Sequence, residues 1–346
     1  MAKRPAARPS SKPRATQRQT VHVLFSCVGR RVELIDAFRR AARKLGLNLV
    51  VHGADLGMSA PAMHHVDRAH IVPPINDPAC RNAMLTIVQA HRIGLIFPLL
   101  DIELPFWAKN RRRFAAHGCN VLVSSPRVVE ICRDKLLTHK TLAALGIDTP
   151  DTWPLSAVRR LRRHHFPYYM KPRRGSAGQG NYRIDNAREL TVLGRRVTDP
   201  IVQEFVDGEE YTIDVYTGMN GIPRCAVPRK RLEIRSGEVA KGVTVRDPRI
   251  IELAMRVARG LRDCRGVVTV QCIASPDGRV RVIEINPRFG GGAPLAIRAG
   301  ADFPRWLLAE HLGRDVRIDP LAFEDGLAML RYDQSVFVEL ENRRRP

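Results

Sequence analysis

The sequence predicts an α/β protein whose N-terminal domain contains a doubly wound parallel sheet. Apolar strand-like runs alternate with amphipathic helical segments over residues 21–123, and strands separated by helices pair in parallel. Beyond residue 200, strand-like runs are joined by short turns such as Asn220-Gly221, which is typical of hairpins. A length of 346 residues allows two or three such domains.

The first domain begins with a buried-strand run at 21–25. In residues 32–45, apolar side chains recur at three-and-four spacing and Gly46 follows, so we expect a helix that ends there. The elements expected after it are a strand at 47–55, a helix around 78–92, a strand at 94–99, a helix at 104–117 and a strand at 120–123.

Ligands of such a sheet bind at the carboxyl ends of its strands. The turn 26–29 lacks the G-x-G-x-x-G fingerprint, so it gives little support for a dinucleotide site. Asp55, Asp101 and Glu103 lie at predicted strand ends. They are candidates for ligand binding, and loop solvation or helix capping is the alternative interpretation.

The next segment combines a lysine with a glycine-rich loop. A helix is expected to begin at Ser125-Pro126 and to continue past Asp134-Lys135 to Gly146. A strand at 166–172 then carries Lys171 near its end, and residues 173–180 are rich in glycine. Backbone N–H groups and an ammonium can together hold a phosphate. Because the lysine precedes the glycines, the spacing differs from a Walker loop, and a glycine-rich hairpin is the alternative.

Residues 201–215 predict two strands joined by a short bend at Asp207-Gly208. The backbone of such a hinge can pair with an adenine edge, and a carboxylate beyond the bend can accept ribose hydroxyl groups. A strand at 222–228, a basic stretch at 228–231 and a helix at 248–261 follow.

The last predicted hairpin joins a strand at 267–274 to a strand at 280–286 through the turn 275–278. This pairing brings Gln271 near Glu284. Strand periodicity places Glu284 and Asn286 on one face. The same periodicity puts Val282 on that face, Ile283 and Ile285 on the other, and Arg288 within reach of the first.

Carboxylate and amide oxygens side by side are ligands that Mg²⁺ accepts. Glu284 and Asn286 are therefore candidate metal ligands, and Arg288 adds a fixed positive charge before the run Gly290–Gly292. The alternative is an ordinary hairpin with a polar outer face.

Composition restricts the class of partner. The formal net charge is +22, and residues 1–20 contain six basic residues and no acidic one. We expect this leader to be disordered because it has no apolar pattern that could join a core. The remaining charge is dispersed, aromatic residues make up 6% of the chain, and no nucleic-acid-binding motif is present. Nucleic acid is thus not the expected partner, whereas a basic surface suits an anion such as ATP.

Cysteine usage and hydropathy indicate a cytoplasmic protein. The seven cysteines are scattered and include no C-x-x-C pair, so we expect reduced thiols. No apolar run approaches the roughly 18 residues needed to span a bilayer, and the N-terminus lacks the apolar core of a signal peptide. No membrane partner is expected.

Taken in order, five stretches of this chain resemble the ATP-grasp superfamily, and within it one ATP-grasp unit of the carbamoyl phosphate synthase large subunit. The stretches are DKLLTHKTLAALGIDTP, YYMKPRRGSAGQG, IVQEFVDGEEYTIDV, VTVQCIA and VIEINPRFGGGAPLAIRAG. The resemblance implies a pre-ATP-grasp α/β domain at 21–123 and an ATP-grasp domain of two α+β subdomains at 124–320. It also implies a smaller lid at about 150–206 and a C-terminal strand segment and tail at 321–346.

The resemblance also implies roles for individual residues. Lys171 and Arg288 would be catalytic, and Glu210 would bind the ribose. Glu204 and Val206 would form the adenine hinge. The other nucleotide-binding candidates are Lys135, Gly175, Ser176, Gly178, Gln203 and Phe205, and the candidate ligands of one or two Mg²⁺ or Mn²⁺ ions are Gln271, Glu284 and Asn286.

Two features depart from the family pattern. Many ATP-grasp ligases have a carboxylate where Gln271 stands, so this position would be a neutral, weaker metal ligand. One grasp unit is present, without a second half or an ammonia-producing domain, so we do not expect a complete carbamoyl phosphate synthase.

The chemistry implied by the family is ATP-dependent ligation of a carboxylate to an amine, with small molecules as substrates and a homodimer left open. Phosphoryl or carboxyphosphate formation without amide synthesis is one alternative, and a non-catalytic ATP-binding or nucleic-acid-associated protein is another. Basic candidates for substrate contact are Arg229, Arg231, Lys241 and Arg298. For the first three of these, a solvated strand edge is the other interpretation.

Overall fold

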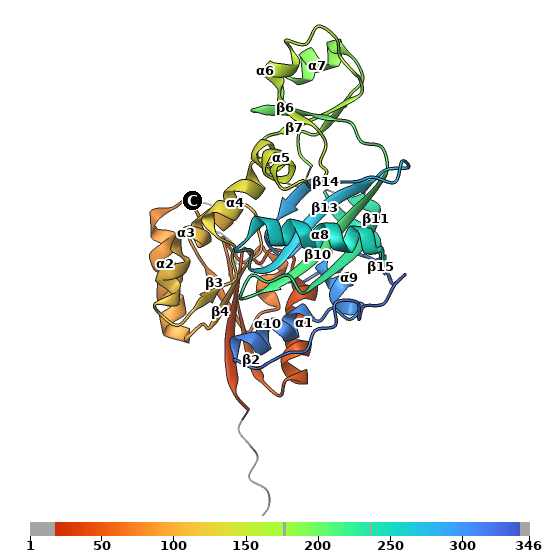
Figure 1. The fold of residues 1–346 in the computed structure, drawn as a ribbon. Helices are drawn as coiled ribbons and strands as arrows, with labels where there is room; N and C mark the ends of the chain where they lie inside the picture. Colours follow the sequence, from red (N-terminus) through yellow and green to blue (C-terminus); the bar gives the residue numbers. More distant parts are fainter. Residues whose placement is uncertain (1–17, 176–177, 236, 340–346) are drawn as a thin grey trace, which may run out of the picture.

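Three β-sheets organise the computed structural model, which describes residues 18–175, 178–235 and 237–339 (Figure 1). A five-stranded parallel sheet belongs to the N-terminal domain, and a six-stranded and a four-stranded antiparallel sheet follow it. The predicted α/β class is confirmed. The leader expected at 1–20 lies, up to residue 17, outside the described residues.

The N-terminal sheet has the order β3-β2-β1-β4-β5. Four of its strands were predicted, whereas the edge strand β3 was not. Its sequence, Arg-Ala-His-Ile, is short and half polar, so it has no apolar run that would indicate a strand. The strands are β1 (Thr20–Ser26), β2 (Asn48–Asp55), β3 (Arg68–Ile71), β4 (Leu95–Pro98) and β5 (Asn120–Val121).

Helices cover both faces of this sheet, as the alternating pattern predicts. Helix α1 (Val32–Lys44) packs Phe38 against Phe25 and Phe97 on one face. Helices α2 (Pro78–His91) and α3 (Leu104–Ala115) cover the other face. The C-terminal helices α9 (Ala293–Arg298) and α10 (Phe303–His311) pack against α1 and thereby join the two parts of the chain.

The helix expected from Ser125 to Gly146 is two helices, α4 (Pro126–Arg133) and α5 (Lys135–Ala144). Asp134 interrupts it with an extended backbone, φ −104° and ψ 102°. Its carboxylate accepts the backbone N–H groups of Leu136 and Leu137, so it caps the second helix. It also binds Arg173, a contact distant in sequence that the local periodicity does not reveal.

The four-stranded sheet forms a lobe that projects at the top of Figure 1. It contains β6 (Thr152–Pro154), β7 (Tyr168–Pro172), β8 (Tyr182–Ile184) and β9 (Pro200–Glu204), with helices α6 (Leu155–Val158) and α7 (Ala187–Leu193). Its side chains form a core of their own, which includes Leu155, Met170, Leu190 and Val202.

The six-stranded sheet has the order β14-β13-β10-β11-β12-β15. Helix α8 (Pro248–Leu261) packs against one face, where Val268 and Val270 are buried. The strand expected at 222–228 instead begins at Cys225 and includes the whole basic stretch. The strands are β10 (Glu209–Gly218), β11 (Cys225–Arg235), β12 (Glu238–Thr244), β13 (Gly266–Ala274), β14 (Val280–Asn286) and β15 (Ala328–Leu330).

A β-bulge in β14 places Val282 and Ile283 on the faces opposite to those predicted. Gln271 pairs with Glu284, but its neighbour Cys272 pairs with Val282, which leaves Ile283 as an extra residue. Val282 is therefore buried on the helix-covered face. Ile283 turns to the face of Glu284, the reverse of what strict alternation predicts.

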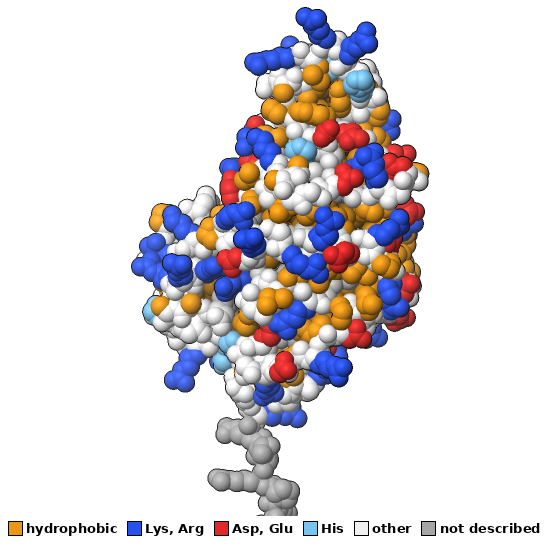
Figure 2. Space-filling view, in the orientation of Figure 1, with side chains coloured by type: hydrophobic (Ala, Val, Ile, Leu, Met, Phe, Trp, Pro, Cys, Tyr) orange, Lys and Arg blue, Asp and Glu red, His pale blue; other side chains and the backbone are white. Residues whose placement is uncertain are grey.

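The basic side chains on the face drawn in Figure 2 are scattered over both domains, with acidic side chains between them. Within the described ranges, no helix has the length and apolar character required to cross a membrane.

Candidate functional site

A cavity of about 310 Å³ lies between the four-stranded sheet and the six-stranded sheet. Strands of both sheets contribute polar side chains to it, so its two walls come from separate layers of the fold. Among the predicted site residues, those that line it are Lys171, Gly178, Gln203, Glu204, Phe205, Val206, Glu210, Arg231, Gln271 and Glu284.

The candidate metal ligands lie together on the wall formed by β13 and β14. Gln271 is directly opposite Glu284, as the predicted hairpin requires. The Asn286 Nδ2 atom donates a hydrogen bond of 3.1 Å to Glu284 Oε1. Asn286 is buried, and Glu284 and Gln271 are half-buried. The three side chains are thus adjacent. Gln271 and Glu284 line the cavity, and Asn286 adjoins it through its contact with Glu284.

Lys171 extends from β7 toward this wall. Its side chain is 4% exposed, and its Nζ donates to the Ile283 carbonyl at 3.3 Å. The extra residue of the bulge therefore supplies the acceptor for the lysine. Burial lowers the pKa of Lys171 to about 8, against the opposing influence of Glu284.

Lys135 and the glycine-rich loop lie beside the cavity. The Lys135 Nζ atom donates to the Gly175 carbonyl at 2.8 Å. Gly175, Gly178 and Gly180 have φ values of 152°, 69° and 73°, which favour glycine because other residues have a Cβ that clashes there. Ser176, a predicted nucleotide contact, lies outside the described residues.

Asp134 is a residue of this region to which the sequence analysis assigned no role. Its carboxylate accepts hydrogen bonds from Arg173, with 2.6 Å between Oδ2 and Nη2. Burial opposes ionisation, but the hydrogen bonds from Arg173 and the Leu137 amide outweigh it and lower the pKa of Asp134. Asp134 thus fixes the start of α5, where Lys135 lies, to the beginning of the glycine-rich loop.

The candidate hinge follows β9. The Gln203 amide donates to Thr152 Oγ1 at 2.7 Å, which fixes its side chain within the four-stranded lobe. The Glu204 carboxylate contacts the Arg281 guanidinium at 3.1 Å. That contact occupies the Glu204 side chain, and the Glu204 N–H donates to the Asp151 carbonyl at 2.9 Å. The backbone of 205–206 is therefore the part of the hinge available to a ligand. Val206 is 9% exposed.

Glu210, the candidate ribose ligand, forms an ion pair with Arg231 across β10 and β11. Both side chains line the cavity. The Arg231 Nε atom is buried and finds no hydrogen-bond partner among the described residues. Of the basic candidates for substrate contact, Arg231 alone lines this cavity.

Arg288 does not line the cavity but lies just beyond the end of β14, the strand that carries Glu284 and Asn286. Its Nη2 atom contacts Asp101 of the N-terminal domain at 2.6 Å, and its backbone carbonyl accepts from Thr269. Asp101, one of three acidic residues predicted at strand ends, therefore reaches the site. Asp55 and Glu103 instead organise loops: Asp55 accepts from the Gly29 amide, and buried Glu103 accepts from Ser26 and Trp107.

Arg229 is neither a solvated strand-edge residue nor exposed to the cavity. It is 1% exposed and forms a bidentate pair with the fully buried Asp214. A Cβ atom at Gly292 would lie 2.2 Å from Arg229 Nη1, so the glycine run makes room for this guanidinium. Lys241 pairs with Glu233 at the surface, and Arg298 is exposed on α9.

A cluster of arginines around Glu238 adds further residues that the sequence pattern did not single out. Arg31 and Arg331 contact the Glu238 carboxylate at 3.3 Å and 3.2 Å. Arg331 also donates to the Gly291 carbonyl, next to the segment that carries Arg288. Arginines in loops follow no periodicity, so their convergence emerges only in the folded chain.

Comparisons with known proteins agree with this architecture. Residues 132–292 match the model of the ATP-grasp domain, and residues 23–122 match that of the PylC-like N-terminal domain. A D-alanine--D-alanine ligase of Fusobacterium nucleatum is 26% identical over 180 residues, 49% of this chain and 59% of that protein. A carbamoyl phosphate synthase large chain of Methanospirillum hungatei is 28% identical over 227 residues, 60% of this chain and 21% of that protein.

Among solved structures, an L-amino acid ligase from Bacillus licheniformis is similar with a TM-score of 0.65 and 22% identity. The match covers 86% of this chain and 75% of that one. The predicted resemblance to ATP-grasp proteins, including carbamoyl phosphate synthase, is confirmed. The chain spans about three fifths of the length of the first of these relatives and about a fifth of the second.

Proposed function

Because the chain carries an ATP-grasp domain behind a PylC-like N-terminal domain, we propose that it is an ATP-dependent carboxylate–amine ligase. One observation carries the proposal: Lys171 from the lid and Glu284 from the six-stranded sheet line the same cavity from opposite walls. A nucleotide bound between these walls would have its phosphates near both a cation and a set of metal ligands.

The residues present fit a hard divalent cation. Glu284 lines the cavity and, within the described part of the chain, forms no ion pair with a basic side chain. Gln271 and Asn286 add amide oxygens beside it, a ligand set that Mg²⁺ or Mn²⁺ accepts. When bound there, the ion would supply charge neutralisation at the phosphates. The Asn286 amide would turn its oxygen toward the ion.

The nucleotide would be held mainly by groups of the lid. The backbone of 205–206 is available to the adenine edge, and the glycine loop with Lys135 is available to the phosphates. The buried Lys171 ammonium would stabilise charge that spreads over the transferred phosphoryl group. Glu210 would accept hydrogen bonds from the ribose hydroxyl groups, and these would replace part of its present contact with Arg231.

The reaction itself would occur between the cavity and the N-terminal domain. A substrate carboxylate oxygen attacks the γ-phosphorus, ADP leaves, and an acyl phosphate forms. An amine then attacks the acyl carbon, phosphate leaves, and the amine loses a proton. Arg288, with Arg31 nearby, would offer positive charge for the carboxylate and the acyl phosphate, in partial exchange for their present contacts with Asp101 and Glu238.

A substrate screen tests this proposal. The purified chain is incubated with Mg-ATP and pooled amino acids, and phosphate release is measured together with new masses. An amide product that forms with equimolar ADP supports the ligase. Added hydroxylamine should trap the acyl phosphate as a hydroxamate.

Two outcomes would favour the alternatives. Phosphate release that depends on bicarbonate, without an amide product, would indicate carboxyphosphate chemistry. Tight nucleotide binding without turnover across broad pools of carboxylates and amines would indicate a non-catalytic nucleotide-binding protein.

A further inference from the structure

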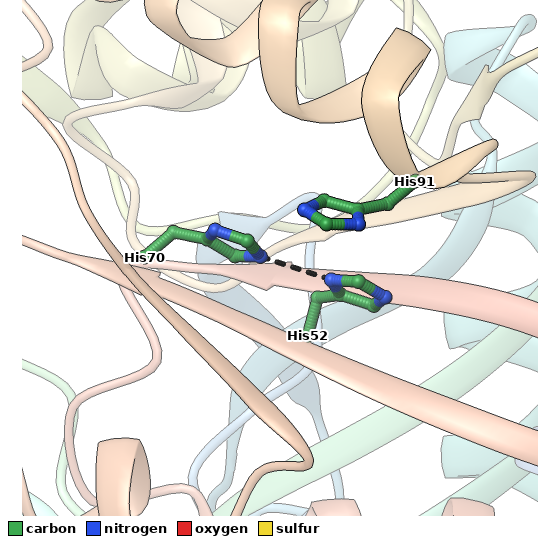
Figure 3. A group of neighbouring side chains, drawn as sticks. All are labelled: His52, His70 and His91. Atoms are coloured by element: carbon green, nitrogen blue, oxygen red, sulfur yellow. Dashed lines mark hydrogen bonds between the residues drawn. The ribbon is translucent and has the colours of Figure 1, made fainter.

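Histidines converge on one face of the N-terminal sheet, away from the nucleotide cavity. His52 lies on β2, His70 on β3, and His91 is the last residue of α2, which covers this face (Figure 3). One ring nitrogen from each lies within 4.8 Å of the others. The register explains the convergence: Ala54 pairs with His70, and His52 is two residues earlier on the same face.

A fourth histidine, His22, determines which ring nitrogen of His52 is available to bind a metal ion. His52 Nδ1 lies 2.9 Å from His70 Nε2, and His52 Nε2 lies 3.1 Å from His22 Nδ1. A neutral imidazole has one donor and one acceptor nitrogen. When His52 Nε2–H donates to His22, the Nδ1 lone pair points toward His70 and His91. A hydrogen bond to the distal nitrogen is how proteins orient a histidine that binds a metal.

We propose that His52, His70 and His91 form a site for a late first-row divalent metal, Zn²⁺ foremost, and that His22 orients His52. Neutral imidazoles favour Zn²⁺, Co²⁺, Ni²⁺ and Cu²⁺ over Mg²⁺. Zinc–nitrogen bonds of about 2.0–2.1 Å place tetrahedral nitrogens about 3.4 Å apart. The three ring nitrogens now lie within 4.8 Å of one another, and small rotations of the rings would bring them to this separation.

The surroundings favour this cation and leave room for a fourth ligand. His91 ends a helix of 14 residues, where the helix dipole is negative. His52 is buried, whereas His70 and His91 are half-buried, so water can reach the open position. Arg68, exposed on β3, is the nearby cation and favours a water or anion as the fourth ligand.

The location indicates a structural role. The cluster joins the short edge strand β3 to the end of α2, while the nucleotide cavity lies between two other sheets. A metal at this site would fasten an edge strand to the helix that covers it. This role is independent of the proposed ligase activity.

Metal binding by the full chain tests the proposal. Chelator-treated protein is dialysed against Co²⁺ or Zn²⁺ without nucleotide, and bound metal and visible Co²⁺ absorbance are measured. We expect one tightly bound metal per chain, with the absorbance of a tetrahedral site, and a melting temperature that rises more with Zn²⁺ than with Mg²⁺. His91→Ala should bind at least tenfold more weakly, and His22→Ala about 10–100-fold more weakly.

Matched variants separate this site from others. His117→Ala removes an exposed histidine of the same domain, Glu284→Gln alters the nucleotide cavity, and Cys27→Ser removes the half-buried thiol. All three should keep the tetrahedral Co²⁺ absorbance of the unchanged chain. Absence of tetrahedral Co²⁺ absorbance in the unchanged chain overturns the proposal, as does equal affinity in His91→Ala. Unchanged affinity in His22→Ala overturns the role of His22.

Discussion

Arg288 and Asp101 form an ion pair between the two domains, with 2.6 Å between Nη2 and Oδ2. Arg288 follows the strand that carries Glu284 and Asn286, and Asp101 follows β4 of the N-terminal sheet. The carboxyl edge of the parallel sheet is thereby fixed against the end of β14. Both side chains are mostly buried, which limits screening by solvent.

The first prediction is that Asp101 positions Arg288 for catalysis. Asp101→Asn should lower kcat about tenfold or more while the KM for ATP stays nearly constant, because the guanidinium loses orientation and the nucleotide contacts remain. Steady-state kinetics measures both. Asp263→Asn, at the exposed pair with Arg111, is the control. A raised KM for ATP at constant kcat would contradict a positioning role.

The second prediction concerns the metal wall. Glu284→Gln keeps the shape of the side chain but removes the charge that would hold Mg²⁺, so phosphate release should fall by about 10² or more without loss of fold. Asn286→Asp still offers an oxygen and should be milder. Glu252→Gln on α8 is the matched control. Normal Mg²⁺-dependent turnover in folded Glu284→Gln protein would refute the metal assignment.

The third prediction is that ATP binding takes up a proton at Lys171. The free lysine has a pKa of about 8, and bound phosphates favour its charged form, so its pKa rises in the complex. Proton uptake should therefore appear above pH 8 and be small at pH 7, and ATP affinity should weaken as the pH rises above 8. Calorimetry in buffers of different ionisation heat measures the uptake. Lys171→Met should abolish it; equal uptake in that variant would exclude Lys171 as its source.

The fourth prediction concerns Arg229 as a structural residue. Arg229→Met leaves the Asp214 carboxylate buried without its partner, a change that typically costs about 3–5 kcal/mol of unfolding free energy. Urea unfolding measures the loss, and adding Asp214→Asn should recover part of it. Arg249→Ala, at an exposed pair, should leave the midpoint nearly unchanged. A small effect of Arg229→Met would show that water or another cation reaches Asp214.

The fifth prediction is stabilisation by nucleotide. At about 100 times its dissociation constant, a ligand that binds only the folded state adds about 2.7 kcal/mol. Mg-ATP should therefore raise the melting temperature of the chain, with a smaller rise for Lys171→Met. No response to millimolar Mg-ATP in the unchanged chain would remove the basis of the proposed function.

Local sequence patterns predicted the hairpin around residues 275–278 and the helices that have a clear apolar periodicity. The turn 275–278 and the flanking apolar runs sufficed to place Gln271 opposite Glu284. Helices α1, α2, α3 and α8 follow their apolar periodicity closely. The order of five short motifs then indicated the ATP-grasp domain.

Features that depend on contacts distant in sequence were missed or misplaced. Asp134 divides a continuous helical pattern into two helices. Its carboxylate binds Arg173, which is 39 residues away and cannot be recognised from the local pattern. The bulge at Ile283 adds a residue that no turn signal marks, and it exchanges the faces expected for Ile283 and Val282. Arg229 belongs to a basic run, and its burial follows from Asp214 on the neighbouring strand.

The separate core of the four-stranded lobe has a consequence for hydrogen exchange. Its apolar contacts, from Leu155 to Val202, are made mainly within the lobe, so the lobe can open or unfold while the six-stranded sheet stays intact. Amides of β7 and β9 should therefore exchange through a sub-global event of lower free energy than amides of β10 and β13. A nucleotide that bridges Lys171 and Glu284 would merge the two regions into one cooperative unit and slow exchange in the lid selectively.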